Sequence, residues 1–204
     1  MKIYRLISFL LAVLIIQSVS FGWTMTPQYA KEIAEKEAAV KGNPSSPDAH
    51  FDLAITYAYT NKVQEGLDEL KKVSTLVPDH KAYARTIITK YYSQVEQSPS
   101  NWRIRFRLAF AYYFGGYKDY AIDELQNVAN TDPKNPWPYG YMSVIQAEQG
   151  KWNKAVGSMK KAIALDSNVA AFHLGLGQGY YKLNIPMKGF SETMEAVRLK
   201  AMGY

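Results

Sequence analysis

The sequence contains no cysteine among its 204 residues. It can therefore form no disulfide, present no reactive thiolate and build no cysteine zinc site. It also contains no serine-nucleophile motif, no paired-carboxylate arrangement and no histidine–glutamate zinc motif. We therefore predict that the chain is not an enzyme and needs no cofactor or metal. Its content of hydrophobic residues, 48%, and of charged residues, 21%, is that of an ordinary folded protein.

Charge of one sign is not in large excess. The chain carries 24 basic and 18 acidic side chains, a formal net charge of +6. A nucleic-acid-binding protein usually shows a stronger and more clustered basic surplus. We therefore predict no nucleic-acid partner.

The first 22 residues differ in character from the rest of the chain. Lys2 and Arg5 precede a run over residues 6–16 that is apolar except for Ser8, and small residues follow it. This order is typical of a secretory signal peptide. The alternative is an uncleaved N-terminal anchor, because the apolar stretch approaches the length of a membrane span. Both alternatives predict that residues 23–204 are exported across the cytoplasmic membrane to a periplasmic or extracellular location. Membrane contact is expected only through residues 1–22, if they are not cleaved.

Internal repetition is the strongest signal in the sequence. One block has a fixed order of apolar, small and turn residues: Leu108, Ala109, Tyr112, Gly116, Ala121, Leu125, Val128 and Pro133. A step of 34 residues gives Met142, Ser143, Gln146, Gly150, Ala155, Met159, Ala162 and Ser167. A second step of 34 gives Leu176, Gly177, Tyr180, Asn184, Gly189, Thr193, Ala196 and Ala201. A move of 55 residues backward gives Leu53, Ala54, Tyr57, Asn61, Gly66, Leu70, Val73 and Pro78.

The spacing within each block predicts two helices. Leu108 and Tyr112 are four residues apart and share a helix face, as do Ala121 and Leu125. Gly116 lies between them, and glycine or asparagine tolerates the left-handed conformation that ends a helix. Each block is therefore expected to be an antiparallel helix hairpin whose apolar face is covered by the neighbouring hairpins.

A unit of this length and pattern resembles the tetratricopeptide repeat (TPR). Residues 102–135 and 136–169 are the clearest copies, residues 47–80 are a fair copy, and residues 170–204 match well in their first helix. The resemblance implies an all-α fold, a right-handed α-solenoid of antiparallel helix hairpins. It also implies an exported scaffold for protein–protein interaction, in the assembly of an envelope or extracellular complex. A membrane-anchored assembly factor is the alternative, and an enzyme or cofactor-binding protein is a distant third.

Two segments lie outside the 34-residue repeat pattern. Residues 81–101 have helical spacing but no partner helix, so they predict one unpaired extra helix. The array either changes direction there, or the extra helix lies across its surface. Residues 23–46 predict a single N-terminal helix that caps the array. The C-terminal end lacks a polar capping helix, which predicts a homo-oligomer or another partner at the last repeat.

In the TPR family the first helices of successive units line a concave groove that binds peptides. The resemblance implies an unusually aromatic groove in this chain, and its predicted lining is Phe51, Ile55, Tyr59, Arg103, Phe106, Phe110, Tyr113, Phe114, Trp137, Val144, Leu174, Gln178, Tyr181 and Lys182. The lysine and asparagine positions of the family's carboxylate clamp hold aromatic and aliphatic residues here. We therefore expect an apolar or aromatic peptide, or a helix, as the partner. The alternative is that the extra helix or the N-terminal helix covers several of these aromatic residues.

Two further groups of residues have competing interpretations. His50 and His173 occupy the same position in their repeats and are expected to be packing residues, with no carboxylate arranged with either as a metal-ligand set. Arg103, Arg105 and Arg107 are expected to be solvated, with their stems packed on the helix surface. An anionic partner near residues 81–101 is the alternative for the arginines.

Overall fold

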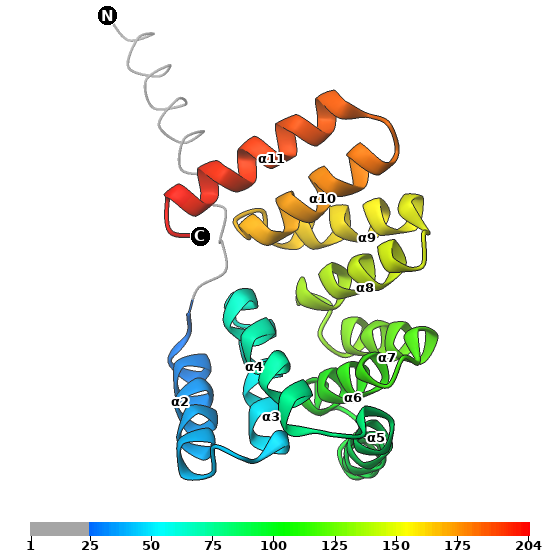
Figure 1. Ribbon diagram of the computed structural model, residues 1–204. Coiled ribbons are helices and arrows are strands. Elements are labelled where there is room, and N and C mark those ends of the chain that lie inside the picture. The colour runs from blue at the N-terminus through cyan, green and yellow to red at the C-terminus, as the bar shows by residue number, and fades with distance from the viewer. Residues whose placement is uncertain (1–24) are drawn as a thin grey trace, which may run out of the picture.

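The computed structural model describes residues 25–204. This part of the chain contains ten α-helices and no strand. In chain order they are α2 (Pro27–Gly42), α3 (Pro47–Ala58), α4 (Val63–Leu76), α5 (His80–Gln97), α6 (Trp102–Phe114), α7 (Lys118–Thr131), α8 (Trp137–Glu148), α9 (Trp152–Leu165), α10 (Ala170–Lys182) and α11 (Pro186–Ala201). Figure 1 shows them in this order.

Four pairs of helices form hairpins: α3 with α4, α6 with α7, α8 with α9, and α10 with α11. The same position of each hairpin turn has a positive φ, at Asn61 (59°), Gly116 (82°), Gly150 (73°) and Asn184 (59°). After each of them the next amide donates to the carbonyl five residues back, as Lys151 does to Gln146 at 2.8 Å. This bond pattern ends a helix in a left-handed residue, which explains why glycine or asparagine stands at this position.

Side-chain caps occur at the N-termini of four helices, none of which follows a tight hairpin turn, whereas α8 and α10 begin hairpins without such a cap. Ser46 caps α3 and Asn101 caps α6 through their side chains, and Thr26 and Asp79 do the same for α2 and α5. The helices after the turns, α4, α7, α9 and α11, have no side-chain cap. Since the preceding turn already fixes their direction, the sequence can do without a capping residue there.

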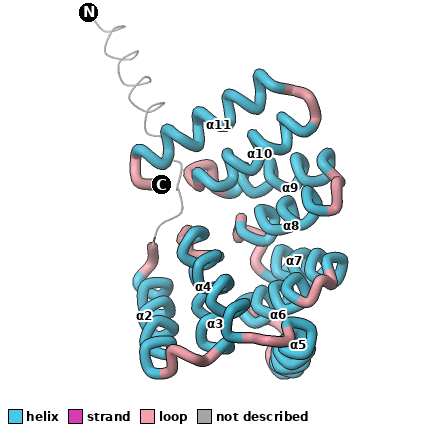
Figure 2. The backbone as a smooth tube through the Cα atoms, viewed as in Figure 1, coloured by secondary structure: helices cyan, strands magenta, loops and turns pink. Residues whose placement is uncertain are grey.

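The hairpins stack side by side into an arch (Figure 1), and its connections are short (Figure 2). The first helices of the hairpins follow one another, because α3 packs on α6 and α8 packs on α10. The extra helix α5 packs along α6, and α4 packs chiefly on α3 and not on α5. In Figure 1, α4 lies on the inner side of the arch.

Helix α3 is the most deeply buried helix. It contacts α2, α4 and α6, and its side chains also reach α5. Every residue from Leu53 to Ala58 is buried, as are His50 and Phe51. A helix that is apolar all round must be surrounded by other helices. The N-terminal part of the arch is therefore a compact bundle around α3, whereas α7 to α11 form a regular stack.

The predicted fold class, an all-α solenoid of helix hairpins with one unpaired helix, is confirmed. The signal peptide or anchor predicted for residues 1–22 lies outside the described residues. Within residues 25–204 no helix is both long enough and apolar enough to cross a membrane.

Candidate functional site

Six of the fourteen side chains predicted to line a groove lie in the hydrophobic core. The exposed fraction is 0% for Phe51, Ile55, Tyr59 and Phe106, 3% for Trp137 and 8% for Phe110. A buried side chain offers no surface to a partner. These six residues therefore stabilise the fold and do not line an open groove, which corrects the sequence-based expectation.

The close packing of α3 on α6 explains this burial. The ring of Tyr59, at the end of α3, lies edge-on to the ring of Phe106, with 5.5 Å between centroids. Tyr141 from α8 covers the other side, at 5.7 Å from Phe106 and 4.8 Å from Phe110. The hydroxyl of Tyr141 donates to the backbone carbonyl of Ala58 at 2.9 Å, so it links α8 directly to α3. The first helices thus bury one another's aromatic side chains. The extra helix and the N-terminal helix also cover some of them, as the alternative expected: Tyr91 of α5 stacks on Phe51 at 5.9 Å between centroids, and Tyr29 of α2 lies 6.3 Å from Tyr59.

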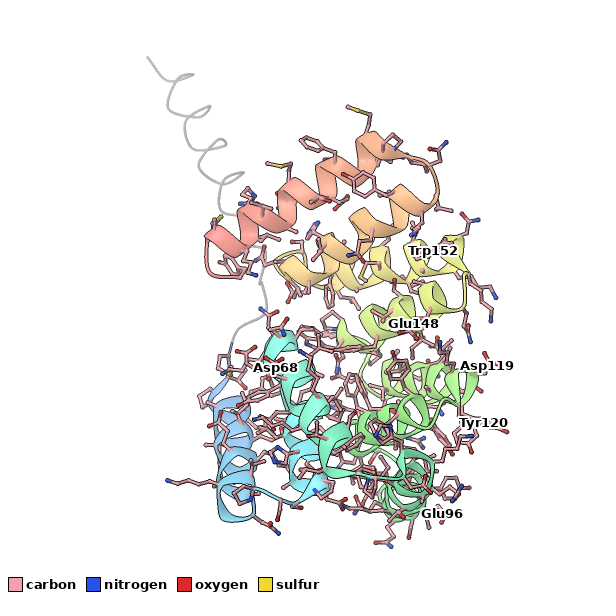
Figure 3. All side chains as sticks on the ribbon, in the orientation of Figure 1. Asp68, Glu96, Asp119, Tyr120, Glu148 and Trp152 are labelled. Carbon is pink, nitrogen blue, oxygen red and sulfur yellow. The ribbon has the colours of Figure 1, made fainter. Side chains whose placement is uncertain are left out.

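The other eight predicted residues are accessible in part, and six of them, all except Val144 and Leu174, do not come together. Arg103 is bonded to Glu32 of α2, and the half-buried Tyr113 donates to Glu148 at the end of α8 (Figure 3). Phe114 packs between the rings of Phe51, His80 and Tyr83. Tyr181 and Lys182 stand exposed at the far end of α10. They form no common surface.

An open cavity does lie on the inner side of the arch. Its volume is about 400 Å³, and the start of α4 forms one wall while α10 and α11 form the other. Three apolar side chains on its lining are well exposed: Leu174 at 46%, Val197 at 56% and Tyr204 at 42%. Lys200 and Glu65 are its only charged lining residues. The cavity is therefore largely apolar and accessible.

A second, smaller cavity borders α4 farther along the same side. Its volume is about 90 Å³, and its lining from α4, α6 and α8 is almost entirely apolar. Leu67 and Val144 on its rim are 48% and 44% exposed. We call Leu67, Val144, Leu174, Val197 and Tyr204 the inner patch. Val144 and Leu174 are the two members of the inner patch that the sequence placed in the groove.

A cluster of charged residues joins α2, α3, α5 and α6. Arg107 is buried and donates to Asp52 at 3.2 Å and to Glu32 at 3.3 Å. It also donates to the hydroxyl oxygens of Thr56 at 3.1 Å and Tyr59 at 3.3 Å. One guanidinium thus neutralises two carboxylates from different helices. Because a buried charge must be paired and hydrogen-bonded, this cluster fixes α2 and α3 against α6.

The pKa values in this cluster favour the charged forms. Burial raises the pKa of Glu32, but the hydrogen bond from Tyr59 and the charges of Arg107 and Arg103 outweigh burial and bring it below its usual value. Burial likewise raises the pKa of Asp52, and Arg107, Tyr91 and two lysines together lower it further than burial raises it. Burial, with the nearby Glu32 charge opposed by Arg107, raises the pKa of Tyr59 to about 12. Both carboxylates are therefore ionised, and Tyr59 is neutral, at neutral pH.

A polar cavity of about 650 Å³ opens beside this cluster. The basic side chains on its lining are already paired with carboxylates: Lys31 with Glu35, Lys36 with Asp52, Lys90 with Asp48, Arg103 with Glu32, and Arg107 as above. An anionic ligand would have to compete with these carboxylates. We therefore interpret the cavity as the solvated edge of a structural ion cluster.

The solvation predicted for the three arginines is wrong. Arg103 and Arg107 pair with Glu32, and Arg105 pairs with Glu124 of α7 at 3.0 Å. The sequence could not show the first two pairs, because Glu32 lies more than 70 residues from Arg103 and Arg107 and outside the 34-residue repeats. The neighbouring acidic partners also leave no open site for the anionic partner considered at this end of the array.

Two histidine–glutamate pairs, which were not predicted from the sequence, recur in equivalent positions of their hairpins. The Nδ1 of His50 contacts Glu69, and the Nδ1 of His173 contacts Glu192 at 2.7 Å. Each Nε2 contacts a backbone carbonyl six residues earlier. Each imidazole ring therefore lies between a glutamate side chain and a backbone carbonyl. Each pair joins the two helices of its hairpin, and the common 19-residue separation is a signal that the sequence did contain.

The described residues contain no group of three or more histidine, aspartate or glutamate side chains placed to hold a metal ion. The histidines of the two pairs each have a single carboxylate and one carbonyl as partners, which is a structural arrangement and not a ligand set.

Comparison with known proteins identifies the architecture. No family model matches the chain, and no curated protein matches it. Among solved structures, a crystal structure of MamA matches with a TM-score of 0.50 and 16% sequence identity, over 84% of this chain and 88% of that chain. A second structure, "MamA MSR-1 C2", matches with a TM-score of 0.50 and 18% identity, over 86% of this chain and 95% of that chain.

The fold is a TPR-like α-solenoid. At identities below 20% the two MamA structures establish the arrangement of helices and nothing about ligands. The TPR-like assignment agrees with the 34-residue repeat in the sequence and with the four positive-φ turn residues. Any function must be argued from the surfaces of this chain.

Proposed function

We propose that the chain is a non-enzymatic scaffold that binds a protein or peptide through the inner patch. One observation carries the proposal: well-exposed apolar side chains from α4, α8, α10, α11 and the C-terminal residue line two cavities of about 400 and 90 Å³ that both border α4. Exposed apolar patches on a folded protein mark interaction sites when they are contiguous and concave.

The chemistry of the patch favours a peptide or helix with apolar anchors. Leu67, Val144 and Leu174 are aliphatic, and the phenol of Tyr204 adds a large surface with a polar tip. Lys200 and Glu65 supply one charge of each sign at the rim. A few buried anchors surrounded by polar groups give most of the affinity of such an interface.

The place of action belongs to the same proposal. The order of charged, apolar and small residues at the N-terminus supports export, and the scaffold would then act in the assembly of a periplasmic or extracellular complex. A membrane-anchored assembly factor is the second candidate, favoured by the length of the apolar stretch. N-terminal sequencing of exported protein separates the two, since the anchored form keeps residues 1–22.

Because the chain has no cysteine, single cysteines allow site-specific photo-crosslinking of the partner. We would attach a cysteine-reactive photoprobe to Leu174→Cys in cells that make the protein, and identify the trapped chain. The matched control is Tyr120→Cys, at an exposed residue on α7 (Figure 3). The proposal expects a discrete cross-linked partner from position 174 and none from position 120.

The affinity of the purified partner is then measured for Leu174→Asp and Leu67→Asp. A charge in the middle of an apolar contact should weaken binding at least about tenfold, because the carboxylate must be desolvated. Tyr120→Asp should bind as the unchanged protein does. Unchanged affinity in both inner-patch variants, with helical content preserved, would contradict the proposal.

A further inference from the structure

The last helix carries a second apolar surface, which extends beyond the proposed binding site and meets the inner patch at Val197. Met187, Phe190, Met194 and Val197 are 79%, 57%, 48% and 56% exposed. Together with the exposed Ala201 they follow one another at steps of three, four, three and four residues. We call these five residues the α11 seam. The buried residues of α11 are Gly189, Ala196 and Leu199, which lie on the opposite side.

The spacing of the α11 seam indicates what kind of surface would cover it. Alternating steps of three and four residues form the a and d positions of a heptad, the pattern by which one α-helix packs along another. An extended peptide would need no such regularity. A surface for lipid would combine its apolar face with an excess of lysine and arginine. Here α11 has three basic and two acidic side chains, and Arg198 is already bonded to Glu195 at 2.7 Å.

We propose that the α11 seam is a homodimer interface, in which α11 packs antiparallel against α11 of a second copy. With the two-fold axis between residues 195 and 196, Phe190 faces Ala201 of the partner subunit and Met194 faces Val197 of the partner subunit. Phe190 then opposes the smaller Ala201, and Met194 opposes the smaller Val197, as close packing requires. The same surface serves both copies, so the assembly closes as a two-fold dimer.

The residues beside the seam are compatible with this register. Ser191 comes opposite Arg198 of the partner subunit, and Thr193 comes opposite Lys200 of the partner subunit. No like charges face each other, whereas like-charge pairs along a helix interface would oppose association. In Figure 1, α11 is the outermost helix at its end of the arch, and α10 covers only its inner side.

The size of the interface sets the concentration at which the dimer should form. A helix of 16 residues is about 24 Å long, and two such helices bury less than the roughly 800 Å² per partner of a standard interface. We therefore expect a dimer in the micromolar range, visible by sedimentation of the purified full-length protein between about 1 and 200 µM.

The decisive variant is Phe190→Glu/Met194→Glu, which places four carboxylates in the two-fold contact. It should raise the dissociation constant at least about 100-fold and leave the circular dichroism spectrum unchanged. Tyr120→Glu, with a comparable exposure of 61% on α7, is the matched control and should dimerise like the unchanged protein. A monomer at 200 µM in the unchanged protein, or a dimer that survives the double variant, would overturn the proposal.

Cysteine cross-linking tests the direction of packing, again because the chain has no cysteine of its own. A mixture of Met194→Cys and Val197→Cys chains should form mixed disulfide dimers, since these positions face each other. Met187→Cys alone should not, because its copies lie at opposite ends of the antiparallel pair. Rapid cross-linking of Met187→Cys would indicate parallel packing and refute the register. Binding of a monomeric protein to lipid vesicles through the α11 seam would refute the dimer in favour of a membrane surface.

Discussion

Replacement of Arg107 by methionine tests the structural role of the buried charge cluster. Methionine retains most of the apolar stem volume but removes the guanidinium. Asp52 and Glu32 then lose a common partner while their side chains remain only 21% and 16% exposed. Removal of one partner from a buried ion pair destabilises a protein by about 3–5 kcal/mol.

The remaining neighbours reduce this penalty. Asp52 keeps Lys36 at 3.3 Å, and Glu32 keeps Arg103 at 3.0 Å. We therefore expect Arg107→Met to lower the free energy of unfolding by about 3 kcal/mol at pH 7, the lower end of that range. Arg105→Met is the matched control. Arg105 has one carboxylate partner, so its loss should cost about 1 kcal/mol.

The effect should depend on pH in a definite direction. Both carboxylates have lowered pKa values in the folded protein, so their stabilising effect is present above the ordinary carboxyl pKa of about 4 and is lost as the pH falls through the lowered values. The variant lacks most of this effect. The difference in free energy of unfolding between the unchanged protein and Arg107→Met should therefore be largest near pH 7 and shrink toward about pH 4 and below.

Urea denaturation followed by circular dichroism at several pH values measures both effects. A loss of free energy of unfolding below about 1 kcal/mol in Arg107→Met at pH 7, or a loss that does not change with pH, would refute the argument from buried charge. The triple variant Arg107→Met/Asp52→Asn/Glu32→Gln should recover part of the stability, because no unpaired charge is left.

Two smaller predictions concern the turns and the link across the arch. Gly150→Ala should lower the free energy of unfolding by about 1 kcal/mol, because alanine resists the φ of 73° at this position. Gly157→Ala lies in the middle of α9, where a Cβ meets no other atom. It should raise the free energy of unfolding by about 1 kcal/mol, because alanine has the higher helix propensity. A destabilised Gly157→Ala would show that helix propensity does not govern this site. Tyr141→Phe removes the hydrogen bond to the carbonyl of Ala58 and should cost about 1 kcal/mol, while Tyr139→Phe, which loses no intramolecular hydrogen bond, should be neutral. Equal unfolding midpoints for the two tyrosine variants would contradict the proposed link between α8 and α3.

The sequence predicts those features that depend on neighbours along the chain. Each hairpin needs its apolar faces, its small residues and one left-handed turn residue within 34 positions, so Asn61, Gly116, Gly150 and Asn184 could be found by counting. The unpaired helix α5 could be found for the same reason, since it interrupts the count.

The sequence fails where distant helices meet. The burial of Phe51 and Tyr59 depends on the position of α6 and α8 beside α3, which no short spacing encodes. The sequence pattern therefore predicts a groove lining from aromatic residues that lie in the core. The partners of Arg107 lie on α2 and α3, 75 and 55 residues away. The contact of His50 with Glu69 is an intermediate case, because the same separation recurs at His173 and Glu192 and could have been noticed.

The unequal burial along the arch has a mechanical consequence. In a solenoid each hairpin contacts only its neighbours. A pulling force can therefore open every interface between hairpins slightly, and the whole array extends. In this chain the hydrogen bond from Tyr141 to the carbonyl of Ala58 and the aromatic contacts around α3 hold helices α2 to α8 together. A pulling force on the two ends of the arch should therefore first separate helices α9 to α11. The arrangement of helices α2 to α8 should stay unchanged.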